Sequence, residues 1–282
     1  MITLSKDDPR AEKHRDTIRP YVGGYDSRKV PYYIIEDNDQ AVGVVIVGEE
    51  PLKIIEPIGT MVSVVLIIDY NQHASAFDEF AGLALEIAKE SKAAYSFIDL
   101  PNKYPIPISS FMNCGYKELA HSLRMSRILE DIMENETSLR FEKVERREVI
   151  DFLDKMKEFM VGSHDAMVDI IFSNLGRLPD SFQDQFYGTE LLFWVYLEKE
   201  LIGILDICPG GVASIANIGV NPVYRGRKYS RQIMLYAMNL LKDLGKERAG
   251  LRVHMENKVA LQLYESLGFS KEASHRALIW RK

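Results

Sequence analysis

The sequence has few cysteines, no excess of positive charge and no long apolar run. Each of these absences excludes a class of protein. Its two cysteines, Cys114 and Cys208, are too few for a disulfide framework and have no Cys-x-x-Cys or Cys/His metal spacing. Both lie in apolar stretches, so we expect buried thiols in a reducing compartment. The formal net charge of −6 argues against a nucleic-acid partner held by bulk electrostatics.

Signals for export or membrane insertion are missing as well. Met1 to Arg19 is dense in charged residues, whereas a secretory signal needs an apolar core there. The longest apolar run, Met61 to Ile68, is far shorter than the roughly 20 residues of a membrane helix. We therefore expect a cytoplasmic protein with no membrane partner.

A charged, weakly patterned segment divides the chain near its middle. We read residues 131–138 as a linker between a first domain, 1–130, and a second domain, 139–282. In the second domain, apolar spacing and turn residues predict strands and helices in a definite order. The predicted strands are Leu139–Val144, Leu191–Leu197, Leu201–Cys208, Val212–Val220, Ala249–His254 and Ala273–Trp280; the predicted helices are Glu145–Met160, Asp165–Leu175, Lys228–Leu244 and Lys258–Leu267.

The first domain shows a fainter version of the same order. Both domains place a glycine–aromatic pair after their last helix, at Gly115-Tyr116 and at Gly268-Phe269. This indicates an internal duplication, and coincidence in a mixed α/β chain is the alternative. The predicted strands are Tyr32–Glu36, Ala41–Val47, Val62–Asp69, Ala94–Leu100 and Lys117–Ile128; the predicted helices are Ala76–Glu90 and Ile108–Asn113.

The segment from Ile218 to Met234 carries the first chemical signal. It reads as a strand, an Asn-Pro stop, a basic loop and an amphipathic helix. The unpaired N–H groups and positive dipole end of that helix, with Arg225, Arg227 and Lys228 beside them, suit a pyrophosphate. An ordinary basic surface loop is the alternative reading.

A second segment, Leu251 to Phe269, has an unusual spacing. Asn257 fits a helix N-cap, and Ala260 and Tyr264 then lie on one face of the helix. Gly268 is placed to end that helix.

Together the two segments resemble the acetyl-CoA-binding core of the GNAT superfamily of N-acetyltransferases. The family's pyrophosphate motif, Arg/Gln-x-x-Gly-x-Gly/Ala, matches at Arg225 to Ser230, although Lys228 stands where glycine is commonest and Ser230 where Gly or Ala is expected. The resemblance implies an α/β (α+β) fold class, with two GNAT-like domains that each have a mixed, mostly antiparallel sheet flanked by helices. The predicted two-domain architecture resembles, in outline, that of tandem GNAT proteins such as mycothiol synthase.

The resemblance also implies roles for particular residues. The backbone of the strand end would bind the pantetheine arm, the loop amides would hold the pyrophosphate, and Asn257 would contact the pantetheine or a bridging water. Tyr264 would return a proton to the leaving thiolate, unless it is an ordinary core aromatic. The residues implied for the cofactor are Ile218, Gly219, Val220, Arg225, Gly226, Arg227, Lys228, Tyr229, Ser230, Asn257 and Tyr264.

The general base is the least defined part of this site. The strand that ends at Val220 offers only Ser214 and Asn217 as polar side chains. His254 and Glu256 are the nearest candidates, and an ordinary exposed or capping role is the alternative for each. The other histidines show no pairing that suggests a metal, so we expect none.

The first domain has no such loop. Residues 69–76 replace it with an aspartate and no arginine, which would repel a pyrophosphate, so we expect this copy to be degenerate.

The predicted function is transfer of an acetyl group from acetyl-CoA to a primary amine on a small molecule or a protein. A non-catalytic acyl-CoA sensor or scaffold on the same fold is the alternative, and a transferase that uses acyl-tRNA or another acyl donor is a third. Acceptor specificity is expected in loops such as Gly176–Gly188 and in the first domain. A homodimer is left open.

Overall fold

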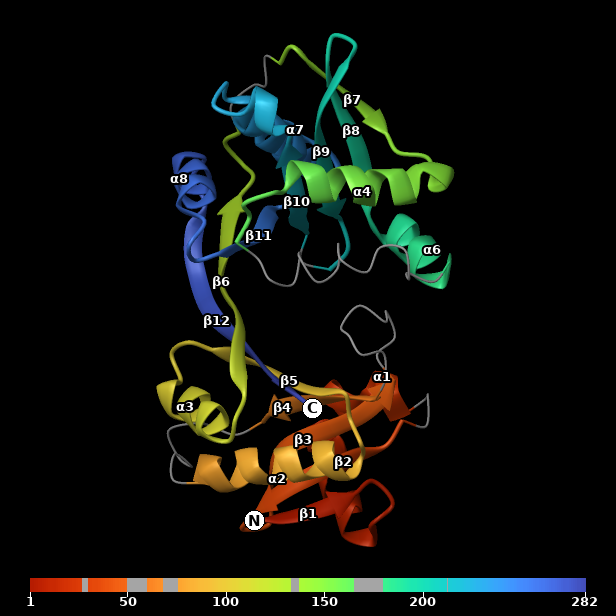
Figure 1. The fold of residues 1–282 in the computed structure, drawn as a ribbon, viewed down its shortest axis with the longest axis vertical. Coiled ribbons are helices and arrows are strands. Elements are labelled where there is room, and N and C mark those ends of the chain that lie inside the picture. The colour runs from red at the N-terminus through yellow and green to blue at the C-terminus, as the bar shows by residue number, and fades with distance from the viewer. Residues whose placement is uncertain (27–29, 50–59, 68–75, 133–136, 165–179, 212) are drawn as a thin grey trace. The chain divides into compact units, whose positions relative to one another are not determined.

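The chain forms two compact units. The structure, a computed structural model, describes residues 1–26, 30–49, 60–67, 76–132, 137–164, 180–211 and 213–282. Unit 1 consists of Met1–His121 and Ser274–Lys282, and unit 2 consists of Ser122–Ala273. Each has a mixed, mostly antiparallel sheet flanked by helices, as the sequence predicts (Figure 1). No helix in the described ranges has the length and hydropathy to cross a bilayer.

The sheet of unit 2 has the order β6-β11-β10-β9-β8-β7. Its neighbouring strands run antiparallel, except that β10 and β11 are parallel. The elements are β6 (Lys117–Ile128, from Ser122 on), β7 (Leu139–Lys143), α4 (Val149–Phe159), α6 (Asp180–Thr189), β8 (Leu191–Leu197), β9 (Glu200–Cys208), β10 (Ser214–Val220), α7 (Tyr229–Asp243), β11 (Arg248–His254), α8 (Lys258–Ser266) and β12 (Ser270–Arg281, up to Ala273).

Helices cover both faces of this sheet. Successive strand residues point to opposite faces, and β8 shows this directly. Phe193 packs edge-on against Tyr236 of α7, with ring centroids 5.7 Å apart, whereas Trp194 packs against Phe152 of α4 at 5.3 Å. The α7 face holds an extensive apolar core, which includes the fully buried Ile233.

Unit 1 repeats this architecture. Its sheet order is β1-β2-β3-β4-β5-β12, with β4 and β5 parallel and the other neighbours antiparallel. Ile34 faces the core beneath α1 and Ile35 the core beneath α2, so two helices again cover opposite faces. The elements are β1 (Ile2–Ser5), α1 (Arg15–Asp26), β2 (Tyr32–Asp37), β3 (Gln40–Glu49), β4 (Thr60–Leu66), α2 (Phe77–Glu90), β5 (Tyr95–Pro101), α3 (Pro105–Asn113), the start of β6 and the end of β12.

The last strand of each unit comes from the other half of the chain. In unit 2, Ser122–Ile128 of β6 pairs antiparallel with the whole of β11. In unit 1, His275–Arg281 of β12 pairs antiparallel with β5. Compactness therefore divides the chain within β6 and β12, and the boundary at 131–138 stays a prediction about the two copies.

Most predicted elements occur within a few residues of their expected ends. The predicted helix Asp165–Leu175 lies outside the described residues. The predicted loop Gly176–Gly188 is wrong from residue 180, where α6 begins. Its sequence is mostly polar, so it offers little apolar spacing to indicate a helix. The strand β1 and the helix α1 were not predicted; Pro20 lies inside α1, where a proline normally argues against a helix.

Candidate active site

A cavity opens in unit 2 where two parallel strands separate. Within the described residues, β10 and β11 pair at a single position, Ser214 with Gly250. A β-bulge at Ala216 shifts the register of β10 against β9, and such a bulge bends its strand. The cavity beside this split has a volume of about 740 Å³, within the usual range for a ligand site.

The start of α7 forms one end of this cavity. Arg225, Gly226 and Ser230 are among the lining residues. The first helical hydrogen bonds are donated by Arg231 and Gln232 to the Lys228 carbonyl, at 3.1 and 3.4 Å. In the described part of the chain, the N–H groups of residues 226–230 have no backbone partner, and no side chain caps the helix. Such a group of free amides at the start of a helix suits an anion.

A left-handed backbone shapes this loop. Gly226 has a φ of +78° and Lys228 a φ of +64°. Glycine adopts this conformation without strain, but a residue with a Cβ does not. The geometry therefore explains why glycine is the common residue at the position of Lys228.

The Arg225 side chain also has a structural role that the sequence did not indicate. Its Nε donates to the Val220 carbonyl at 3.1 Å and its Nη2 to the Phe159 carbonyl at 2.9 Å. The guanidinium thus joins the end of β10 to the end of α4. It fixes the walls of the cavity as well as adding charge.

Four of the predicted cofactor residues do not line the cavity: Gly219, Arg227, Lys228 and Tyr229. Arg227 is exposed and lies over the Tyr224 ring, 5.6 Å from its centroid. Gly219 is buried, and a Cβ there would lie 2.8 Å from the Phe159 Cβ, so glycine permits the close approach of α4. Ile218 and Val220 do line the cavity.

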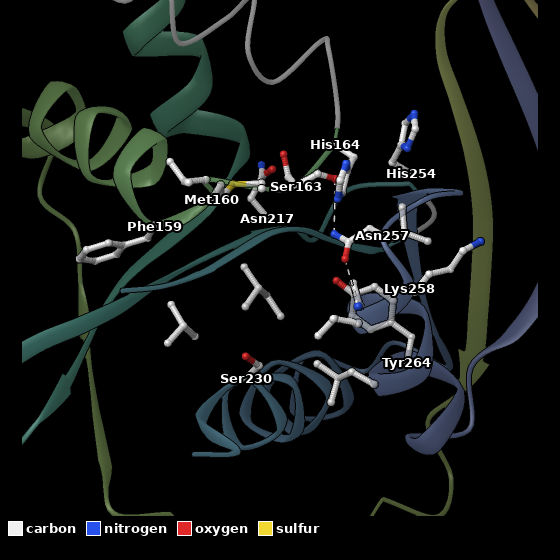
Figure 2. Close-up of a pocket in the computed structure, with 18 of the residues that line it drawn as sticks. Phe159, Met160, Ser163, His164, Asn217, Ser230, His254, Asn257, Lys258 and Tyr264 are labelled. Atoms are coloured by element: carbon white, nitrogen blue, oxygen red, sulfur yellow. Dashed lines mark hydrogen bonds between the residues drawn. The ribbon is translucent and has the colours of Figure 1, made fainter. Parts of the chain in front are cut away.

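The start of α8 forms the opposite wall (Figure 2). Asn257 caps the helix, since its Oδ1 accepts a hydrogen bond from the Ala260 N–H at 3.2 Å. Its Nδ2 donates to the Ser163 carbonyl at 3.4 Å, which ties the segment after α4 to α8. Gly268, with a φ of +80°, follows the end of the helix, as predicted.

Tyr264 projects from α8 into the same cavity. In Figure 2 its ring lies beneath Asn257. Its hydroxyl has no hydrogen-bond partner among the described residues, while its ring packs near Phe269, with centroids 6.1 Å apart. Burial raises the pKa of Tyr264 to about 12, because the phenolate would be poorly solvated. The phenol is therefore protonated at neutral pH.

His254 and Glu256 both line the cavity. His254 Nδ1 accepts a hydrogen bond from the Glu256 N–H at 3.3 Å. A neutral His254 would then carry its proton on Nε2, which makes that nitrogen a donor and not a base. Glu256 is exposed and is the remaining candidate of the two.

Sequence reasoning missed the segment that follows α4. Residues 159–164 line the cavity, and the His164 ring lies against that of His254, with centroids 6.4 Å apart. No motif marks this segment, so its position depends on the packing of α4. Among the described residues, no cluster of side chains could hold a metal ion.

A buried carboxyl group was also missed. Asp206 of β9 is 1% exposed, and its Oδ2 accepts a hydrogen bond of 2.7 Å from Nδ2 of Asn217, which lines the cavity. Burial, together with the neighbouring Glu190, raises the pKa of Asp206 to about 8, although the Asn217 hydrogen bond lowers it. The sequence did hold a signal, because Asp206 interrupts the apolar run of β9.

Comparison with known families agrees with this geometry. Residues 159–269 match the model of the acetyltransferase (GNAT) family, and they include the loop 225–230, Asn257 and Tyr264. This part of the chain is a GNAT acetyltransferase domain.

Two curated relatives carry acetyltransferase names. A mycothiol acetyltransferase of Nocardiopsis dassonvillei is 31% identical over 83 residues, which are 29% of this chain and 24% of the relative. A [ribosomal protein bS18]-alanine N-acetyltransferase of Haemophilus ducreyi is 28% identical over 86 residues, 30% of this chain and 59% of the relative. The match thus spans less than two thirds of each relative's length.

Solved structures share the fold over a larger part of the chain. A GCN5-related N-acetyltransferase from Sphaerobacter thermophilus superposes with a TM-score of 0.63 at 11% identity, covering 99% of this chain and 95% of that one. A tandem GNAT protein from the clavulanic acid biosynthesis pathway gives 0.55 at 10% identity, covering 89% and 82%. At these identities the likeness concerns the fold alone.

Proposed function

We propose that unit 2 transfers an acetyl group from acetyl-CoA to a primary amine. One observation carries this proposal: among the described residues, Gly226 and Ser230, whose backbone amides are free, line the same cavity as Tyr264, whose hydroxyl is unpartnered. The first group suits a pyrophosphate and the second suits a leaving thiolate. The GNAT domain at 159–269 supports the same assignment.

The cofactor would lie along the split between β10 and β11. Its pyrophosphate would bind the amides of the cradle, residues 225–230, and its pantetheine arm would pair with the backbone of residues 218–220. The bulge at Ala216 leaves that strand edge open, since β10 and β11 pair at one position in the part of the chain that the structure describes. Asn257 would contact the arm near its amide groups.

The transfer requires one bond to form and one to break. The amine nitrogen attacks the thioester carbonyl carbon, and the carbon–sulfur bond breaks. An amide N–H near Val220 would stabilise the oxyanion. Tyr264 would give its proton to the thiolate, while the attacking nitrogen loses one proton to Glu256 or to water. The products are the acetamide and free CoA.

We infer that unit 1 no longer binds the cofactor. Among the described residues, its strands β4 and β5 pair at three positions, against one for β10 and β11, and the register of β3 against β4 shows no shift. The strand edge that would receive a pantetheine is therefore more closed. The predicted acidic replacement loop, 69–76, lies outside the described residues except for Ala76.

One observation favours a second candidate, a non-catalytic acyl-CoA sensor. A phenol with a pKa of about 12 is a weak acid, so Tyr264 would be a poor proton donor to the thiolate. A sensor would bind acetyl-CoA without releasing free thiol.

The Tyr264→Phe variant separates these functions. We expect acetyl-CoA affinity to stay within twofold of wild type, while turnover falls by roughly 10²–10⁴, the usual contribution of a positioned acid. Calorimetry gives the affinity, and release of free thiol with a panel of amines gives the turnover. Tyr196→Phe is the matched control, because Tyr196 of β8 does not line the cavity.

Two results would count against the proposal. Equal turnover in Tyr264→Phe would remove the tyrosine from the mechanism. Binding of acetyl-CoA by wild type without thiol release, with every amine tested, would favour the sensor.

A further inference from the structure

The burial of the Asp206 carboxyl group within β9 costs free energy of folding. It is 1% exposed within β9, between Leu205 and Ile207, which are both fully buried. A buried polar group without a partner destabilises a fold, and Asp206 Oδ1 has no hydrogen-bond donor among the described residues. Oε2 of Glu190, the residue before β8, is also a buried atom with no hydrogen-bond partner among the described residues.

One proton shared between the two carboxyl groups would give both unpartnered oxygens a hydrogen bond. The side chains of Asp206 and Glu190 interact directly, and burial raises the pKa of each. Two adjacent carboxylates, of which Asp206 is buried and Glu190 half-buried, repel each other, so such a pair holds one proton between them at neutral pH. The other titratable group acting on the pair from the described residues is the thiol of Cys208, also on β9.

Asn217 connects the pair Asp206–Glu190 to the cavity. Its Nδ2 donates to Asp206 Oδ2 at 2.7 Å, so the carbonyl oxygen of the same amide is left for the cavity. The bulge at Ala216 lies immediately before it. Figure 2 shows Asn217 beside Met160 and Ser163, across the cavity from Tyr264.

We propose that the carboxyl pair Asp206–Glu190 orients Asn217, so that its carbonyl oxygen receives an N–H of the acceptor amine. The proposal rests on the acetyltransferase function above and names its acceptor as a group that presents N–H donors beside a singly charged carboxyl pair. The amine is thereby favoured over a hydroxyl or thiol acceptor, since its nitrogen can donate to Asn217 and still attack. Asp206 is a positioning residue that acts through Asn217.

The first test compares Asp206→Ala, which removes the oxygen that accepts from Asn217, and Asn217→Ala with Ser214→Ala. Ser214 is the other polar residue of β10 and does not line the cavity. We expect the amine KM to rise at least about tenfold in the first two variants, the loss of one hydrogen bond to a charged network, and to stay unchanged in the third. The acetyl-CoA Kd should stay within twofold in all three variants.

A pH profile provides a readout that a merely structural role would not move. In wild type, kcat/KM for the amine should change across pH 8, where Asp206 loses the shared proton, and this step should disappear in Asp206→Asn. An unchanged amine KM in Asp206→Ala, or an unchanged pH profile in Asp206→Asn, would overturn the proposal. If that variant does not bind acetyl-CoA, Glu190→Gln takes its place, with the same expectations and the same refuting result.

An infrared measurement on wild type needs no variant. A protonated-carboxyl band should be present at pH 7, fade above pH 8, and shift when amine is added but not when acetyl-CoA alone is added. The absence of this band would overturn the shared proton. If wild type acetylates no amine although the band is present, the proposed function itself fails, and the role of Asn217 fails with it.

Discussion

Replacing Lys228 by glycine should make unit 2 more stable. Lys228 has a φ of +64° at the residue before α7 and forms no side-chain cap. A left-handed backbone costs an L-residue roughly 1–2 kcal/mol, and glycine returns about 0.4–1 kcal/mol of that through its freer unfolded state. The expected gain in the free energy of unfolding is therefore about 1 kcal/mol.

The matched control is Lys228→Ala, which removes the same charge but retains the Cβ. The two variants should differ by about 2–4 °C in melting temperature for a unit of this size. The transition to follow is the one that added acetyl-CoA raises, because it reports on the unit that binds the ligand. Both variants should bind acetyl-CoA up to about fivefold more weakly at low salt, since an exposed charge contributes little. Equal melting temperatures in the glycine and alanine variants would refute the argument from backbone strain.

Three further predictions follow from the fold and its charges. Arg225→Lys should weaken acetyl-CoA binding by at least about tenfold although the charge is kept, because one ammonium cannot join both the Val220 and Phe159 carbonyls; unchanged calorimetric affinity would contradict this. A fragment of residues 139–282 should fail to fold or to bind acetyl-CoA, whereas residues 122–273 should do both, because β6 supplies Leu123 and Met125 to the core at roughly 1.5–3 kcal/mol each; circular dichroism of the two fragments decides, and a folded shorter fragment would refute it. The hydrogen bond from His14 and the ion pair with Lys13 lower the pKa of Glu36, so its contribution to stability is present above its ordinary pKa of 4.5 and is lost as the pH falls through the lowered value. In Glu36→Gln, thermal melting between pH 3 and pH 7 should lack this part of the acid destabilisation, and parallel curves for the two proteins would refute the assignment.

Much of the fold follows from local sequence signals. The order of strands and helices in unit 2 was predicted from apolar spacing, and Asn257 and Gly268 marked the two ends of α8 correctly. These features depend on residues close together in the chain. The exchange of β6 and β12 could not be predicted in this way, because strand pairing at such separation leaves no local pattern.

The same distinction between local signals and contacts of distant segments applies to the candidate site. The cradle and Tyr264 were predicted because each belongs to a contiguous motif. The anchoring of Arg225 on Phe159 and the link from Asn217 to Asp206 join different elements, so they require the folded chain. Whether the lining residues bind acetyl-CoA stays a prediction.

Calorimetric titration of the full chain with acetyl-CoA tests the central claim most directly. The free amides of residues 226–230 define one cradle in unit 2, and unit 1 is proposed to have lost its own. We therefore predict one bound acetyl-CoA per chain, and no binding in a variant with Arg225→Glu. A stoichiometry of two would contradict the degenerate state of unit 1, and the absence of binding would contradict the acetyltransferase assignment itself.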